Sequence, residues 1–204
     1  MMRAIVSRTV LALLFAPVCF LPSAPGQQKL TASVPDADEY AIYSLIIRTR
    51  FDHRGLTKIV IKEHSGMSYL TDQMRDERQF WSYVRNKLPG IQADTVADFK
   101  AENKTADQFK NEFSLKVPCI LVTDEETNAI FRASGDGWYS FYKKYPGAQG
   151  ILTFSRVGFD RQRKQALVYF GNQRQSLDGA GYLALLAKKD RTWVMVKQTM
   201  IWIS

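Results

Sequence analysis

Apolar residues recur at helical spacing through the first two thirds of the chain and at strand-like spacing after it. Tyr40, Tyr43 and Ile47 lie three to four residues apart, which predicts an amphipathic helix that reaches Phe51. The helix is expected to begin at Asp36, because Glu39 three residues later completes a capping box. Further apolar stripes predict helices over 75–88, 93–103, 124–131 and 137–145.

Strand signals dominate the last quarter of the chain. Runs over 151–159, 165–171, 182–188 and 193–203 predict a four-stranded antiparallel meander, with a longer loop over 172–181. Earlier strands are predicted over 57–62 and 115–123, and Pro118 favours an edge position or a late start for the second. Neighbouring residues of both parities are apolar in the meander, so we expect a curved sheet covered on both sides, with helices in its concave face.

The predicted fold class is therefore α+β, with N-terminal helices packed on a curved antiparallel sheet that ends in a four-stranded C-terminal meander. Residues 36–204 are expected to form a single domain, since this length buries a core without disulfides or metals. The sequence shows no internal repeat and no second long apolar run.

The first 26 residues have the pattern of a secretory signal peptide that is removed. Arg3 and Arg8 precede an apolar run over 10–21, and small or turn-forming residues follow over 22–26. The run is shorter than the roughly 20 residues that a membrane-spanning helix needs. The sequence predicts a periplasmic or secreted protein without a transmembrane segment in the mature chain, and a flexible lead-in over 27–35.

Charge and cysteine content refine this prediction. The net charge of +8 includes the two signal-peptide arginines, so the mature chain stays basic and favours anionic partners. Of the two cysteines, Cys19 leaves with the signal peptide. Cys119 lies in the apolar run 117–122, which predicts a buried, inert thiol in a disulfide-free protein.

The C-terminal third carries a recurring pattern. Its parts are SRVGF at 155–159, QALVY at 165–169, GAGY at 179–182, Trp193 and IWIS at 201–204, preceded by GWYSFY at 137–142 and YPG at 145–147. This pattern resembles a group of uncharacterised exported bacterial proteins, which implies export and no particular activity. The architecture is also distantly similar to the nuclear-transport-factor-2-like cone, whose members include enzymes and binding modules.

Signatures of catalysis and cofactor binding are sparse. Only His53 and His64 are available as imidazole ligands, without metal-site spacing, so neither a metal nor a cofactor is predicted. Asp124, Glu125 and the following Glu126 favour a helix start over a general-base site. Neither a serine-nucleophile motif nor a phosphate-binding loop occurs.

Arg156 is the most unusual polar residue, because it interrupts an apolar run. A buried charge must be paired or reach solvent. The sequence favours an ion pair with Asp136 or Glu39, and the alternative is a ligand-binding arginine. As one polar anchor among aromatic residues, Arg156 is grouped in a predicted ligand pocket with Trp138, Tyr142 and Tyr169.

Cations gather in two turns that a meander places at the same end. These cations, the basic rim, are Arg161, Arg163, Lys164, Lys188, Lys189 and Arg191. The rim suits anionic lipid or polysaccharide, or it simply keeps the sheet edge soluble. Nucleic acid is not an expected partner, because RNA-binding signatures with exposed aromatic residues are missing.

Three functions remain open. The favoured hypothesis is a non-enzymatic binding module of the bacterial cell envelope, whose partner is an anionic envelope component or a small molecule. The first alternative is a small hydrolase or isomerase that uses His64 with Asp124 or Glu125, which requires hydrogen-bond contact within a cavity. The second alternative is anchoring to anionic envelope polymers through the basic rim.

Overall fold

The computed structural model describes residues 35–52, 55–67, 76–133 and 135–204. The predicted signal peptide, the lead-in up to residue 34 and His53 lie outside these residues. Within them, no helix is both long and apolar enough to cross a membrane.

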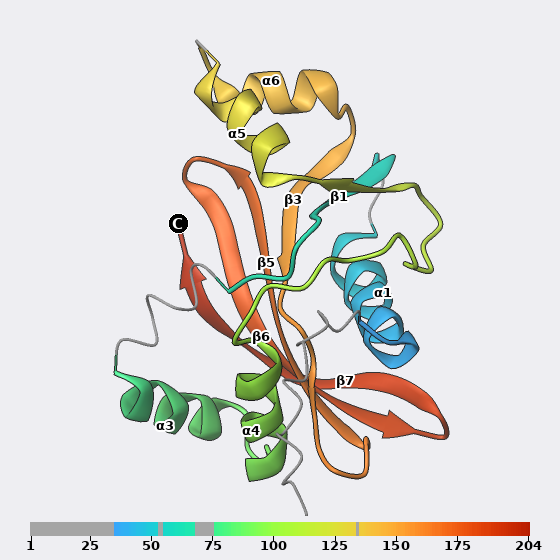
Figure 1. The fold of residues 1–204 in the computed structure, drawn as a ribbon, viewed down its shortest axis with the longest axis vertical. Coiled ribbons are helices and arrows are strands. Elements are labelled where there is room, and N and C mark those ends of the chain that lie inside the picture. The colour runs from blue at the N-terminus through green and yellow to red at the C-terminus, as the bar shows by residue number, and fades with distance from the viewer. Residues whose placement is uncertain (1–34, 53–54, 68–75, 134) are drawn as a thin grey trace, which may run out of the picture. The chain divides into compact units, whose positions relative to one another are not determined.

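Five helices and seven strands are described (Figure 1). In chain order they are α1 (Ala37–Phe51), β1 (Lys58–Lys62), α3 (Glu77–Lys87), α4 (Ala93–Glu102), β2 (Cys119–Val122), α5 (Asp124–Arg132), α6 (Gly137–Lys144), β3 (Ala148–Phe154), β4 (Gly158–Phe159), β5 (Gln165–Gln175), β6 (Asp178–Lys189) and β7 (Thr192–Ile203). The α+β class is confirmed, and each predicted helix is present. The capping box predicted at Asp36 and Glu39 is formed at the start of α1.

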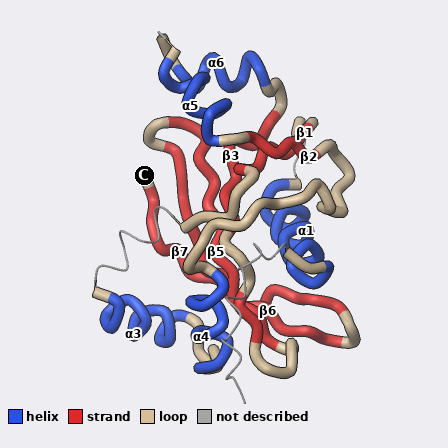
Figure 2. The backbone as a smooth tube through the Cα atoms, viewed as in Figure 1, coloured by secondary structure: helices blue, strands red, loops and turns tan. Residues whose placement is uncertain are grey.

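The strands form one curved sheet in the order β2-β1-β3-β5-β6-β7, and β4 pairs with β5 (Figure 2). The predicted meander is confirmed, since β3, β5, β6 and β7 pair antiparallel in turn. β1 differs, because it runs parallel to both β2 and β3. β2 is an edge strand that starts directly after Pro118. Proline has no backbone N–H to donate, which favours an edge position and a start after the proline.

Helices cover both faces of the sheet and are not confined to the concave one. α1 packs on one face against Leu152, Val168 and Leu186. On the opposite face α3 and α4 pack on Leu167 and Leu185, while α5 and α6 pack over the β1–β3 end. Successive strand residues point to opposite faces, so this two-sided cover explains why the meander lacks an alternation of apolar and polar residues.

Two segments differ from prediction. The run 151–159 is not one strand: it breaks between β3 and β4, where the Arg156 backbone exchanges hydrogen bonds with the Asn103 side chain. The loop predicted over 172–181 is instead a hairpin, because Asn172 pairs with Ala180 and Gln173 with Gly179. The polar side chains of this stretch concealed its strand character.

Candidate functional site

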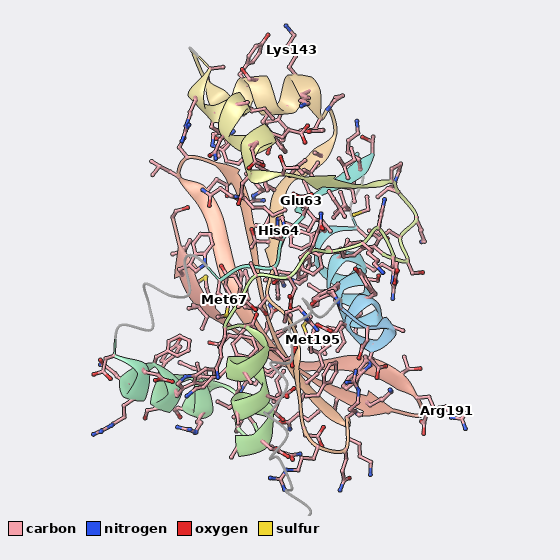
Figure 3. All side chains as sticks on the ribbon, in the orientation of Figure 1. Glu63, His64, Met67, Lys143, Arg191 and Met195 are labelled. Atoms are coloured by element: carbon pink, nitrogen blue, oxygen red, sulfur yellow. The ribbon has the colours of Figure 1, made fainter. Side chains whose placement is uncertain are left out.

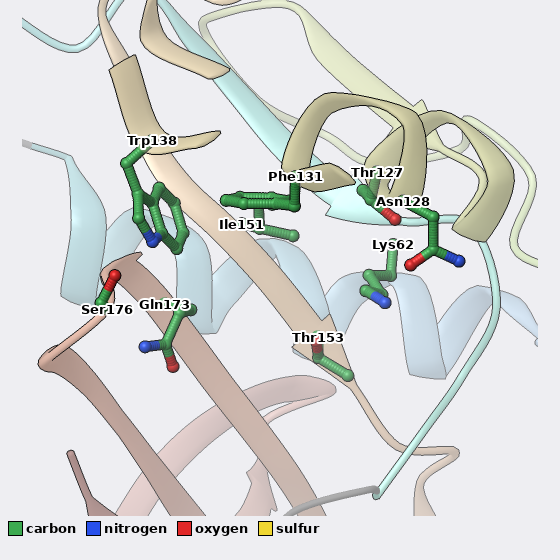
Figure 4. Close-up of a pocket in the computed structure, with 9 residues that line it drawn as sticks. All are labelled: Lys62, Thr127, Asn128, Phe131, Trp138, Ile151, Thr153, Gln173 and Ser176. Carbon is green, nitrogen blue, oxygen red and sulfur yellow. The ribbon is translucent and has the colours of Figure 1, made fainter. Parts of the chain in front are cut away.

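A groove of about 380 Å³ opens on the sheet face opposite α1 (Figure 4). We call it the central groove. It is lined by Lys62, Thr127, Asn128, Phe131, Trp138, Ile151, Thr153, Gln173 and Ser176. This volume lies in the range of roughly 300–1,000 Å³ that is typical of small-molecule sites.

Strand register brings the floor of the groove together. Ile151 pairs with Gln173 across β3 and β5, and paired residues share a face. Ile151 also pairs with Val60 on β1, so Lys62, two residues further, points to that same face. The end of β1, the middle of β3 and the end of β5 therefore contribute to one surface.

Aromatic rings from α5 and α6 form one wall. The Phe131 and Trp138 rings meet edge to face, with centroids 4.8 Å apart, and lie across from Gln173 and Ser176 (Figure 4). Gly137 permits this packing, because a Cβ atom there would lie 2.5 Å from Cδ1 of Phe131. Asp136 accepts a hydrogen bond from the Trp138 backbone N–H and so fixes the start of α6. The wall is held by backbone and ring contacts on both sides.

The polar part of the lining consists mainly of amides and hydroxyls. Asn128 presents an amide that both donates and accepts hydrogen bonds, and Ser176 adds a hydroxyl. The Gln173 amide nitrogen already donates to the Gln175 carbonyl at 2.6 Å, and the amide oxygen is buried. The Lys62 ammonium lies 2.7 Å from Oδ1 of Asp124, so its charge is compensated at the groove's edge. The Thr127 hydroxyl already donates within α5, to the carbonyls of Thr123 and Asp124.

Two further hollows adjoin the central groove. The hairpin hollow, about 460 Å³, shares Trp138 and Ser176 with it and adds Tyr139, Tyr142 and Leu177. The strand-end hollow, about 180 Å³, shares Lys62 and Thr153 and adds His64, Glu63 and Asp124 among its lining residues. The three spaces therefore follow one another along this face.

The structure separates the four residues of the predicted pocket. Trp138 and Tyr142 line the hairpin hollow, and the Tyr142 hydroxyl donates to the Arg174 carbonyl at 2.9 Å. Tyr169 is 1% exposed and its hydroxyl accepts a hydrogen bond from the Trp202 indole. Arg156 is 4% exposed. The grouping of all four in one pocket is therefore wrong: two belong to the surface and two to the core.

Arg156 forms a buried ion-pair cluster. Its Nε and Nη2 donate to the two Glu39 carboxylate oxygens at 2.9 and 2.7 Å, and Nη1 pairs with Asp107. Burial disfavours its charge, but hydrogen bonds from the guanidinium to Glu39 and Asp107 outweigh burial and raise the pKa of Arg156. The pairing with Glu39 that the sequence suggested is confirmed, and Asp136 instead caps α6.

His64 and Asp124 line the same strand-end hollow, yet each has another partner. Asp124 is bonded to Lys62, and Nδ1 of His64 lies 3.5 Å from Oε1 of the neighbouring Glu63. Glu125 is not among the described residues that line this hollow. The contact that the hydrolase alternative requires is not among the hydrogen bonds of these described side chains.

The turns that carry the basic rim lie side by side, because the Lys188 backbone N–H donates to the Lys164 carbonyl at 2.8 Å. Two of the six cations have acidic partners in α1 and its cap: Arg163 pairs with Asp36, and Lys188 with Asp38. The other four are exposed: Arg161, Lys164, Lys189 and Arg191. Arg191, at the tip of the β6–β7 hairpin, lies far from His64 and Lys143 (Figure 3). The basic rim and the central groove are thus separate surfaces.

Asp38 links α1 to this end of the sheet and predicts a pH-dependent stability. Burial alone would raise the pKa of Asp38, but hydrogen bonds from Lys188 and Trp193 outweigh it and lower the pKa. A carboxylate whose pKa is lowered by folding stabilises the fold above its unfolded pKa, and this contribution is lost as pH falls through the folded value.

We therefore expect Asp38→Asn to lower the free energy of unfolding at pH 7 by about 1 kcal/mol, the scale of partly exposed ion pairs. The difference from the unmodified protein should shrink as pH falls below about 4, where the unfolded carboxyl takes up its proton. Urea unfolding across this pH range measures it, with Asp190→Asn in the exposed β6–β7 turn as the control. A difference that does not change with pH would contradict the proposed role of Asp38.

Cys119 is half-buried on β2, less enclosed than predicted. Burial raises the pKa of its thiol to about 12, so the thiolate that would react is scarce at neutral pH.

Comparison with known proteins finds no matching family model, no matching curated protein and no matching solved structure. Geometry alone therefore defines the candidate site. Among the residues that the structure describes, no group of three or more His, Cys, Asp or Glu side chains is placed to hold a metal ion.

Sequence reasoning identified Trp138 but not Lys62, Asn128, Phe131 or Gln173. A signal existed for Lys62, which is the first polar residue after the apolar run of β1. It also existed for Gly137, a glycine that directly precedes a tryptophan. No sequence signal pointed to Gln173, because its position in the groove depends on the pairing of β5 with β3.

Proposed function

We propose that the chain is a non-enzymatic binding module of the bacterial cell envelope, exported by its first 26 residues, and that its small-molecule ligand binds in the central groove. The observation that carries this proposal is the wall of Phe131 and Trp138, whose shape depends on the absence of a side chain at Gly137. A residue chosen for close ring packing at a surface groove supports a preorganised site.

The engaged polar groups favour binding over catalysis. Asp124 and His64, the pair that the hydrolase alternative uses, each contact another charged side chain instead. The remaining groove lining offers amides, hydroxyls and rings, which orient a ligand but supply neither a base nor a nucleophile with an activating partner.

Anchoring through the basic rim is the second candidate. Four exposed cations on two adjacent turns favour it. Arg163 and Lys188 are not counted among them, because they pair with acidic residues at the start of α1. Such a surface would attract anionic polymers in a salt-dependent manner.

Variants of the aromatic wall test the proposed site. We expect a panel of neutral small molecules, screened by NMR, to include ligands that shift the Trp138 indole and the Asn128 side-chain amide. Trp138→Ala should lower the affinity for these ligands at least tenfold, because it removes the largest apolar contact surface. Gly137→Ala should also weaken them several-fold, although it adds only a methyl group, because it displaces the Phe131 ring.

Tyr83→Ala, an exposed tyrosine on α3 outside the three hollows, is the matched control and should leave affinity unchanged. Ligand shifts that map to the basic rim instead would favour anchoring. Turnover of a ligand that stops in His64→Ala would replace the binding module with the hydrolase or isomerase alternative.

A further inference from the structure

We infer that the ligand is a neutral oligosaccharide chain that spans all three hollows. This inference rests on the proposed function and adds the class and the length of the ligand.

The three hollows are neighbours. The central groove shares Lys62 and Thr153 with the strand-end hollow, and Trp138 and Ser176 with the hairpin hollow. Each shared pair borders two spaces at once, so the spaces are direct neighbours, and an occupant longer than one space reaches the next across the shared side chains. A compact molecule fills one of these spaces, whereas a chain of similar units fills the series.

The aromatic lining of the hollows matches sugar rings. Aromatic faces carry partial negative charge and attract the C–H face of a pyranose ring. The central groove presents Phe131 and Trp138, and the hairpin hollow presents Tyr142 and Tyr139, whose side chain is 69% exposed. Aromatic residues thus recur in successive spaces, as a repeating ligand requires.

The polar groups of the central groove suit sugar hydroxyls. Each sugar hydroxyl donates and accepts, and amides match it because they do both as well. Asn128 on α5 presents such an amide to the central groove, and Ser176 presents a hydroxyl at the other end of the groove (Figure 4). The Gln173 amide nitrogen, by contrast, already donates to the Gln175 carbonyl at 2.6 Å. A ligand between Asn128 and Ser176 can hydrogen-bond at both ends while a ring face lies on Trp138.

The charge of the lining disfavours an anionic chain at this site. Lys62 is the only Lys or Arg among the described residues that line the three hollows, and Asp124 lies 2.7 Å from its ammonium. Glu63 and Asp136 add negative charge to the two outer hollows. An acidic polymer would meet repulsion here and attraction at the basic rim.

Affinity as a function of chain length tests the inference. Calorimetry on the full chain would compare cellohexaose and N-acetylchitohexaose with their disaccharides, and with oligogalacturonate as the anionic probe. We expect at least one neutral hexasaccharide to bind ten times more tightly than its disaccharide or better, with little dependence on salt. The two neutral series distinguish a plain glucan from an N-acetylated chain.

Variants in the outer hollows locate the chain. Tyr139→Ala and His64→Ala alter exposed side chains and leave the core intact, so both should fold. Each should lower the affinity for the hexasaccharide about three- to tenfold and leave the affinity for the disaccharide unchanged, whereas Trp138→Ala should lower both affinities. Tyr83→Ala again serves as the control.

The outcomes separate the two proposals. Equal affinity for long and short sugars, lost in Trp138→Ala, would overturn the spanning chain and leave the groove as a binding site. If a non-saccharide ligand binds, Trp138→Ala abolishes its binding and no sugar binds, only the proposed ligand class is overturned. If no probe or screened molecule responds to Trp138→Ala, both proposals fail. Preference for oligogalacturonate that disappears at high salt would assign binding to the basic rim.

Discussion

Replacing Arg156 with methionine should destabilise the protein by about 3–5 kcal/mol, the cost of removing one partner from a buried ion pair. Glu39 and Asp107 are 2% and 5% exposed, and both accept hydrogen bonds from the guanidinium. Without it, two buried carboxylates lose the ion-pair partner that they share, and no other cation of the described residues forms an ion pair with either of them. Urea unfolding followed by circular dichroism measures the loss.

Arg163→Met is the matched control, because Arg163 also pairs with an acidic residue of the α1 start but lies near the surface. Its loss should stay at about 1 kcal/mol or less. Arg156→Lys keeps the charge but not the planar fork that reaches both Glu39 oxygens, so an intermediate loss is expected. If Arg156→Met costs no more than the control, the cluster does not hold α1 to the sheet.

The Arg156 cluster also shows how far sequence reasoning reaches. A charge inside an apolar run predicts a buried partner, and Glu39 was one of two candidates although it is 117 residues away. The requirement for a partner is local physics. The choice of partner is not, because it depends on which helix end the sheet places beside the β3–β4 break.

Local signals predicted the elements well, and pairing between distant strands was the part they missed. The capping box at Asp36 involves residues three apart, and the hairpins of the meander involve neighbouring strands. The parallel contact of β1 with β3 joins Val60 to Ile151, and no feature of either strand specifies that neighbour. Parallel pairing needs a long connection whose path depends on the whole fold.

The central groove was missed for the same reason. Its floor combines Lys62, Thr153 and Gln173 from three strands, which share a face only through register. A shift of one residue in any pair would send that side chain to the α1 face. Trp138 was predictable because a large aromatic residue beside a helix cap is conspicuous by itself, whereas Gln173 becomes a lining residue only once β3 lies beside β5.

Gly158→Ala should cost about 3 kcal/mol, because it would force α4 away from the sheet. A Cβ atom at Gly158 would lie 2.3 Å from the Phe99 backbone nitrogen and 2.4 Å from its Cα atom. Backbone cannot rotate away as a side-chain end can, so the whole helix must move, and overpacking of this kind costs roughly 1–3 kcal/mol or more.

The movement would also break polar contacts that depend on the same approach. The Phe159 N–H donates to Asp98 at 2.7 Å, and the Asn103 side chain both donates to and accepts from the Arg156 backbone.

Gly66→Ala is the control, since its Cβ would meet only a Thr153 methyl group at an ordinary 3.7 Å, and its effect should stay within about 0.5 kcal/mol. Equal midpoints of urea unfolding for the two variants would show that α4 does not depend on a bare backbone at Gly158. A selective loss in Gly158→Ala would establish that this glycine sets the distance between helix and sheet, and with it the position from which Asn103 supports the Arg156 cluster.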